Sequence, residues 1–138
     1  MLKKYKTKWY KDRIINTISD YRITTIKRMR IGNSSLNYQK KDNTLKSQCG
    51  NCKNGIIETN EHYFLSCPKY HKERNTLLEN IKLSKVKGTN TMKTILGFFP
   101  EIYKNKTKYK IHKKDIETIF RSTMDYITST GRFKIKNQ

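Results

Sequence analysis

The sequence predicts a small, mainly α-helical domain, and three observations lead to this fold class. Apolar residues recur at intervals of three and four along much of the chain, as in helices that bury one face. Hydrophobic residues make up only 34% of the sequence, against the about 45–50% that is usual on a count including glycine. All three cysteines and one of the three histidines lie within residues 49–67. A modest core beside such a cluster favours helices held together by a metal staple.

In the N-terminal part of the chain, the residue pattern predicts a basic arm followed by a helix. Lysine alternates with other residue types over 1–8, which we expect to form a basic arm. From Trp9 to Met29 the apolar residues follow helical spacing, so we expect one long helix, or two with a break near Ser19. Gly32 follows this pattern and suits a left-handed cap at the helix end.

Two further helical segments are expected after the cysteine-rich segment. Pro68 suits the first turn of a helix that ends before Gly88. Asn90 is a candidate N-cap for a short segment that Pro100 stops.

The last helix has the most regular pattern in the chain. Its apolar face repeats at i, i+3, i+4, i+7, i+8 and i+11, formed by Ile116, Ile119, Phe120, Thr123, Met124 and Ile127. We expect this helix to end at Gly131 and residues 131–138 to form a second basic arm. The helices and the cysteine-rich segment would then make one domain over residues 9–130.

The cysteine-rich segment has the spacing of a metal site, C-x2-C-x9-H-x4-C. Thiolate sulfur and neutral imidazole suit zinc, and four such ligands close a tetrahedral structural site. The predicted ligands of this one structural zinc are Cys49, Cys52, His62 and Cys67. His71 is an alternative to His62. Gly50 is free to adopt the backbone angles of a tight turn between the first two cysteines.

The same segment contains the only strand that we consider. Residues 56–59 are compatible with a short strand, and so with a short β-hairpin inside the zinc knuckle.

The residue pattern argues against catalysis. A catalytic zinc keeps one coordination position open, whereas four ligands are predicted here. Acidic residues are few and scattered, so no acid–base pair stands out, and every cysteine belongs to the metal set. We therefore expect no enzymatic activity and no small-molecule substrate.

The charge distribution indicates a polyanionic partner. The net charge is +20; residues 49–80 are neutral, and each flank carries +10. Neutralised phosphates release counterions and supply most sequence-independent affinity, so we expect RNA or DNA to bind to the flanks. The alternative is a solvated surface in a lysine-rich protein. The candidate phosphate contacts are Arg13, Lys27, Arg28, Arg30, Lys104, Lys106, Lys108, Lys110, Lys113 and Lys114.

Aromatic residues among the lysines leave two roles open. Tyr5, Tyr103 and Tyr109 would suit either stacking on unpaired bases or packing in the core, and the same choice holds for Trp9 and Tyr10.

Cysteine usage and hydropathy predict the compartment. Three cysteines cannot all pair as disulfides, and the basic N-terminus lacks the apolar run of a signal peptide. No stretch approaches the ~18–20 apolar residues of a membrane span. We expect a reducing intracellular setting, either the nucleus, the cytoplasm or a nucleoprotein particle, and no membrane partner.

Several segments together resemble a family of retroelement proteins. Residues 28–37 resemble the R-L-R-T-G-H-S-x-L-N run of non-LTR retrotransposon polyproteins, although Asn33 replaces the usual histidine. Residues 49–74 resemble the CCHC zinc-binding pattern that follows the reverse transcriptase there, with its E-T-x-E-H, Cys-Pro and downstream Arg. Residues 95–97 and 130–133 resemble the L-L-G and T-G-R-F runs that close such regions.

The resemblance implies the accessory zinc domain alone. The sequence contains no Tyr-x-Asp-Asp motif to hold catalytic magnesium and no acidic set fit for ribonuclease H. In the family this region is thought to help bind template or element RNA. The alternative, from another functional class, is a structural subunit of a large nucleoprotein or virion-like assembly, in which the basic arms bridge partner proteins and become ordered on binding.

Overall fold

The structure is a computed structural model that describes residues 21–32, 34–36 and 47–133. Helices account for 66% of the described residues, which contain no strand. The predicted mainly α-helical class is therefore confirmed. The N-terminal arm, the helix start near Trp9 and the candidate contact Arg13 lie outside the described residues, as do residues 134–138.

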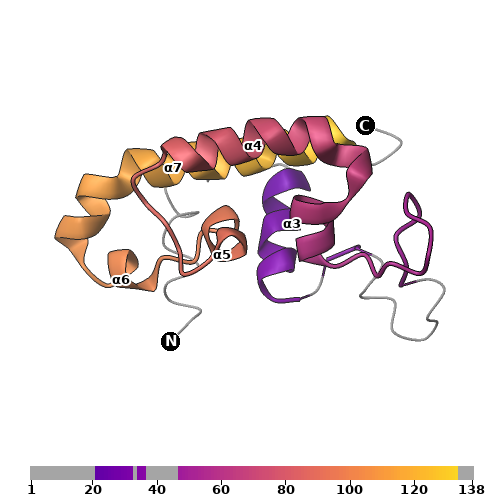
Figure 1. Cartoon of the computed structure of the whole chain (residues 1–138). Helices are drawn as coiled ribbons and strands as arrows, with labels where there is room; N and C mark the ends of the chain where they lie inside the picture. The colour runs from indigo at the N-terminus through magenta and orange to yellow at the C-terminus, as the bar shows by residue number, and fades with distance from the viewer. Residues whose placement is uncertain (1–20, 33, 37–46, 134–138) are drawn as a thin grey trace.

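The described residues contain five α-helices and two short turns of other helix types (Figure 1). In order they are α3 (Tyr21–Arg30), the π-helical turn η3 (His62–Ser66), the 3₁₀ turn η4 (Pro68–Tyr70), α4 (His71–Leu83), α5 (Thr91–Ile95), α6 (Pro100–Tyr103) and α7 (Lys106–Thr130). None of them is long and apolar enough to cross a bilayer, as far as the described helices go.

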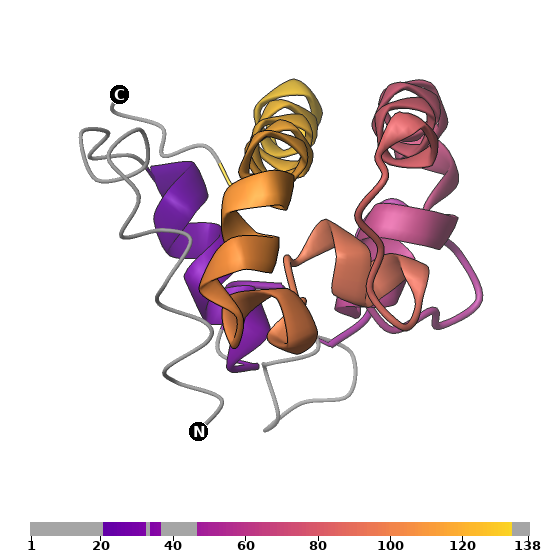
Figure 2. The ribbon, with the colours of Figure 1, turned by 90° about the vertical axis from the view of Figure 1, so that its left-hand side faces the viewer.

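Helix α7 organises the domain. It packs against α3, α4, α5 and α6, and α4 runs antiparallel beside it (Figure 1). Viewed from the side, α4 and α7 form an upper layer over the shorter helices (Figure 2). The predicted apolar face of the last helix is confirmed, because all six of its residues are buried. Burying each of the five isoleucine, phenylalanine and methionine side chains contributes about 1.5–3 kcal/mol before the conformational entropy of ordering it is counted.

The helix also begins earlier than the apolar pattern indicates. Asn105 caps it, because the side-chain Oδ1 accepts hydrogen bonds from the backbone N–H groups of Thr107 (3.0 Å) and Lys108 (3.1 Å). The lysine-rich residues 106–114 are therefore helical.

The predicted helix ends are found at glycine and asparagine. Gly32 and Gly131 have left-handed φ angles of 71° and 64°, and Asn90 Oδ1 accepts from the Lys93 N–H at 2.8 Å. The prediction that Pro100 stops the short segment was wrong, because α5 already ends at Ile95, just before the left-handed Gly97 (φ 75°), and Pro100 begins α6.

Two expectations for the chain ends and the hairpin need correction. The expected strand at 56–59 is reduced to a single antiparallel bridge between Gln48 and Ile57. Two residues assigned to the expected C-terminal arm are part of the fold instead, because Arg132 pairs with Glu58 and Phe133 packs on the core. These two residues belong to the folded domain.

Candidate metal centre and basic surface

The four predicted metal ligands meet in space. Ligand atoms of Cys49, Cys52, His62 and Cys67 all lie within 4.8 Å of one another. Cys67 Sγ is 3.9 Å from the Sγ atoms of both Cys49 and Cys52, and Cys52 Sγ is 3.3 Å from His62 Nε2. This group can hold one metal ion.

The first two ligands sit on a backbone turn. The Cys52 N–H donates to the Cys49 carbonyl at 3.4 Å, and the Cys49 N–H donates to the Ile56 carbonyl at 2.6 Å. Gly50 does not supply the unusual angles that we expected, because its φ is not positive. The left-handed residues are Asn54 (φ 72°) and Gly55 (φ 71°), which reverse the chain between Cys52 and the bridge.

The other two ligands flank the π-helical turn η3. The Cys67 N–H donates to the His62 carbonyl at 2.7 Å, which is the i→i+5 bond of such a turn. This wider turn places Cys67 over His62, whereas five residues of an α-helix at 3.6 per turn would not. Thr59 Oγ1 begins the segment by accepting from the His62 N–H at 3.0 Å.

Arg74 on α4 is hydrogen-bonded to the backbone of this turn. Its Nε donates to the Phe64 carbonyl at 3.0 Å and its Nη2 to the Cys67 carbonyl. The side chain is buried, and these two carbonyls supply acceptors for its guanidinium group, although the Cys67 carbonyl also accepts from the Tyr70 N–H at 3.2 Å. The sequence pointed to Arg74 only as part of the retroelement-like pattern.

A bidentate ion pair fastens the C-terminal segment to the metal-bearing segment. Arg132 Nε lies 2.9 Å from Glu58 Oε2, and Arg132 Nη2 lies 2.6 Å from Glu58 Oε1. Glu58 is only 1% exposed, and Nη2 of Arg132 also donates to the Ser35 carbonyl at 3.3 Å. The hydrogen bonds to the carboxylate raise the pKa of Arg132. Sequence analysis missed this pair, although both residues lie in the runs that carried the resemblance.

Tyr63 centres an aromatic cluster beside the ligands. It is fully buried, and its ring makes edge contacts with Phe64, Tyr70, Tyr126 and Phe133 at centroid distances of 4.8–5.4 Å. Its hydroxyl lies 2.6 Å from Thr130 Oγ1, and the Tyr126 hydroxyl donates to the Tyr63 carbonyl. Burial raises the pKa of both tyrosines, so these hydroxyls stay protonated as donors. The end of α7 is thereby fixed to the metal-bearing turn.

Three of the four ligand side chains favour their neutral form when no metal ion is bound. Burial, together with the two neighbouring thiols, raises the pKa of Cys52 to about 12, and burial also raises the pKa of Cys67. Burial lowers the pKa of His62, which favours the neutral imidazole. Two of the thiols therefore stay protonated in the absence of metal, and a bound ion would displace those protons.

The alternative ligand His71 is excluded by its position. It is exposed on α4, where its Nε2 lies 3.5 Å from Asn75 Nδ2, and it is not part of the ligand cluster.

Most of the described candidate phosphate contacts lie at the surface, but Arg30 does not. Arg30 is buried, its Nε and Nη2 donate to the carbonyls of Leu96 (2.5 Å) and Gly97 (3.1 Å), and its guanidinium lies over the Phe98 ring. The prediction that Arg30 contacts phosphate was wrong, because it holds α3 to the segment after α5. The remaining candidates, Lys27, Arg28, Lys104, Lys106, Lys108, Lys110, Lys113 and Lys114, are exposed.

The lysine-rich segment 103–114, which we call the basic run, contains two tyrosines that pack on the domain. Tyr103 is buried, and its hydroxyl donates to the Gly97 carbonyl at 3.0 Å. Tyr109 is half-buried against Tyr103, with ring centroids 6.0 Å apart. Tyr103 therefore packs in the core and is not available for base stacking.

The metal cluster and the basic run lie at opposite ends of the molecule. In Figure 1 the loop 47–57 is at the right-hand end, and the first turns of α7 are at the left-hand end. A partner bound along residues 106–114 would therefore not contact the ligands.

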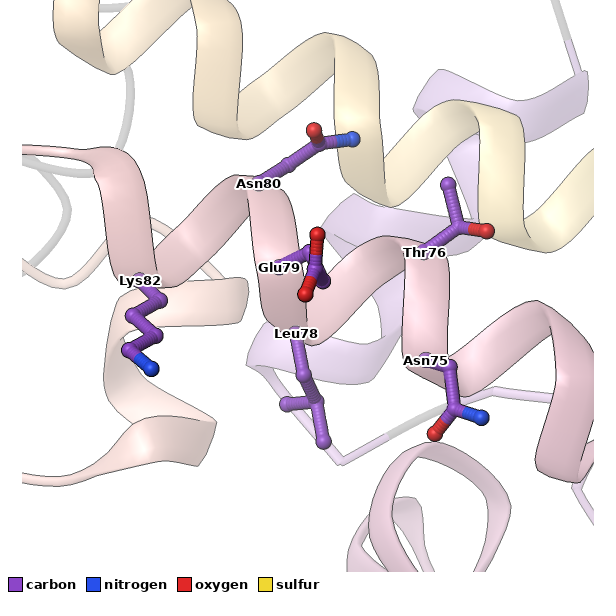
Figure 3. Close-up of a pocket in the computed structure, with 6 residues that line it drawn as sticks. All are labelled: Asn75, Thr76, Leu78, Glu79, Asn80 and Lys82. Atoms are coloured by element: carbon purple, nitrogen blue, oxygen red, sulfur yellow. The ribbon is translucent and has the colours of Figure 1, made fainter.

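An open polar hollow marks the outer side of α4 (Figure 3). It has a volume of about 580 Å³ and is lined by Asn75, Thr76, Leu78, Glu79, Asn80 and Lys82. Thr76 and Asn80 point toward α7, whereas Asn75 and Leu78 point away from it (Figure 3). All these residues come from one helix, and none is a predicted ligand or phosphate contact.

Comparisons with protein-family models, curated protein sequences and solved structures find no match for this chain.

Proposed function

We propose that this chain is a non-enzymatic, zinc-stapled helical domain that binds nucleic acid through phosphate contacts. In this proposal it is similar in role to the accessory zinc domain that follows retroelement reverse transcriptases. Zinc maintains the fold, and the basic surface binds the partner.

The donor set and its spacing support zinc as the metal. With Zn–S bonds of about 2.3 Å, tetrahedral ligands lie about 3.8 Å apart, and an S–N pair lies about 3.5 Å apart. The distances of 3.9 Å for two sulfur pairs and 3.3 Å for the sulfur–nitrogen pair are close to these values. Three soft thiolates with one imidazole also favour zinc over magnesium or calcium, which prefer oxygen.

The observation that carries the binding proposal is a cluster of lysines at the N-terminal end of α7, where positive charge is unfavourable. The first nine residues of α7 contain Lys106, Lys108, Lys110, Lys113 and Lys114, and its first turn has no acidic residue. The helix dipole is positive at this end, so each nearby cation is destabilising by about 0.3–1 kcal/mol, and like charges at i, i+4 add to the cost. Such a local conflict is typical of a functional surface. A bound polyanion would offset it, because both the lysines and the dipole attract negative charge.

The general test is the salt dependence of polynucleotide binding. We expect the observed association constant to fall steeply between about 50 and 200 mM salt, as counterions are released from each contacted phosphate. Fluorescence anisotropy with a labelled oligonucleotide measures this slope. A flat salt response, or no binding at low salt, would contradict the proposal.

A structural role in a nucleoprotein assembly is the second candidate. Ile111 is 69% exposed in the middle of the basic run, and Leu83 is 80% exposed at the end of α4. Apolar side chains beside lysines suit an acidic protein surface with apolar contacts. Co-purification of a protein at fixed stoichiometry after nuclease treatment would favour this candidate, whereas loss of every partner with the nuclease would favour direct nucleic-acid binding.

The cost of the basic helix start leads to a separate prediction. Lys106→Glu places a negative charge at the positive end of α7, so we expect the free energy of unfolding to rise by about 0.3–1 kcal/mol. We expect the same change to weaken polynucleotide binding. Denaturant unfolding and anisotropy measure the two effects on one sample.

Lys82→Glu is the matched control, because it makes the same charge change in the last turn of α4. There the cation is favourable, so this variant should lose stability and keep its polynucleotide affinity. If both variants weaken binding equally, net charge alone governs the interaction.

A further inference from the structure

The outer face of α7 carries an ordered row of cations. Lys106, Lys110 and Lys114 are each four residues apart, and Arg121 follows seven residues later on the same side of the helix, beyond the half-buried Glu117, which interrupts the row of four cations. All four are exposed. Four residues of α-helix advance about 6 Å, so the row extends over about 22 Å from Lys106 to Arg121. We call these four residues the α7 ridge.

The ridge is directed away from the core and held rigidly. The opposite face of the same helix buries Ile116, Ile119, Phe120 and Ile127. The four ridge residues lie on one continuous helix, which sets their spacing. Packing against four other helices holds α7 in place in the domain. Such a row suits phosphates that recur at regular spacing.

The described surface offers no aromatic platform beside the ridge. The strongly exposed large hydrophobic residues of the described chain are Ile31, Ile56, Ile57, Leu83 and Ile111, and all are aliphatic. Tyr103 is buried, and Tyr109 is half-buried against it. Single-stranded nucleic acid gains about 1–3 kcal/mol for each base that stacks on an aromatic ring, and the ridge cannot supply this contribution.

The phosphate charge density then decides whether double-stranded or single-stranded nucleic acid binds better to the ridge. The slope of log K against log salt is about −0.9 for each phosphate neutralised on B-DNA and about −0.7 on a single strand. For four contacts the slopes are about −3.6 and −2.8. Without stacking, the partner with the denser phosphates releases more counterions and is favoured at low salt.

We infer that the α7 ridge binds the sugar–phosphate backbone of a double-stranded nucleic acid, without reading its sequence. This inference rests on the proposed nucleic-acid-binding function and specifies both the surface and the form of the partner. Three of the four cations are lysines, which bind phosphate as point charges and lack the planar fork of arginine. Recognition of base edges relies mainly on bidentate contacts, so similar affinity for unrelated duplexes is expected.

The test compares two triple variants of equal charge. The ridge variant is Lys106→Gln, Lys110→Gln and Lys114→Gln, and the control is Lys82→Gln, Lys85→Gln and Lys87→Gln, which neutralises three exposed lysines at the end of α4 and in the segment after it. Each protein is titrated by anisotropy against a short DNA duplex, an RNA duplex of the same sequence and the separate strands, between about 50 and 200 mM salt. Circular dichroism checks that the helices remain.

We expect the unaltered protein to bind a duplex more tightly than either of its strands. The ridge variant should lose about 2.7 from the DNA-duplex salt slope, whereas the control should keep the slope. A preference for either DNA or RNA duplex over the strands supports the inference and identifies the partner. Equal or tighter binding of single strands, or equal loss in the control, would overturn it and leave the proposed function standing. Absence of binding to every polynucleotide would overturn the proposed function itself.

Discussion

Replacing Cys67 with serine is expected to unfold the metal-bearing segment and to remove most of the cooperative unfolding transition. Cys67 is fully buried and lies 3.9 Å from both other sulfur atoms. Structural zinc in small modules contributes about 10–16 kcal/mol of apparent binding free energy at neutral pH, which is folding free energy when the site exists only in the folded chain. A domain of ordinary stability, at about 5–15 kcal/mol, would lose most or all of its stability with that contribution.

Metal analysis and circular dichroism measure this effect together. The unaltered protein should contain one zinc per chain and lose helical signal when a chelator removes it, and Cys67→Ser should show the chelated signal from the start. His71→Ala is the matched control, because His71 is exposed on α4 and outside the ligand cluster. Metal-free protein with full helical signal and an unchanged melting temperature would refute the staple.

Replacing Arg132 with alanine is expected to lower the free energy of unfolding by about 3 kcal/mol, the lower end of the about 3–5 kcal/mol lost when one partner leaves a buried ion pair. The cost arises at Glu58, whose side chain is 2% exposed and would keep an unpaired carboxylate. The lower end applies because the Arg132 side chain is 23% exposed, so water reaches part of the pair.

A double-mutant cycle distinguishes this mechanism from lost packing. Glu58→Gln combined with Arg132→Ala removes the buried charge, so the double variant should be more stable than Arg132→Ala alone. Denaturant unfolding of the four proteins gives the coupling energy. If the two substitutions add without coupling, the ion pair is not the source of the loss. Lys104→Ala provides a comparison, since the exposed Lys104–Glu101 pair at 3.3 Å should contribute less than about 1 kcal/mol.

Local sequence signals predicted the helices and the ligand set well. The apolar face of α7 and the caps at Asn90 and Gly131 depend on residues within a few positions of one another, so periodicity and side-chain chemistry are sufficient to predict them. The ligands also lie within one short segment, and their spacing alone indicated that they meet.

The two predictions that misplaced an arginine share a physical cause. Arg30 bonds to carbonyls 66 and 67 residues away, and Arg132 pairs with a carboxylate 74 residues away. Nothing local distinguishes such a buried arginine from a surface one, because each sits among other basic residues in the sequence. The early start of α7 had a local signal in Asn105, but the lysine-rich segment after it lacks apolar periodicity.

The large sequence separation between Glu58 and Arg132 has a consequence for the order of folding. The four ligands lie within a segment of 19 residues, and closing a loop of this length costs about 1 kcal/mol less than closing one of about 74 residues. A metal ion could therefore gather its ligands before α7 docks. The contacts between α7 and this segment, Tyr63 with Thr130 and Glu58 with Arg132, span 67 and 74 residues. Contacts of this separation form slowly, so we expect the C-terminal end of α7 to dock on the metal-bearing segment late in folding.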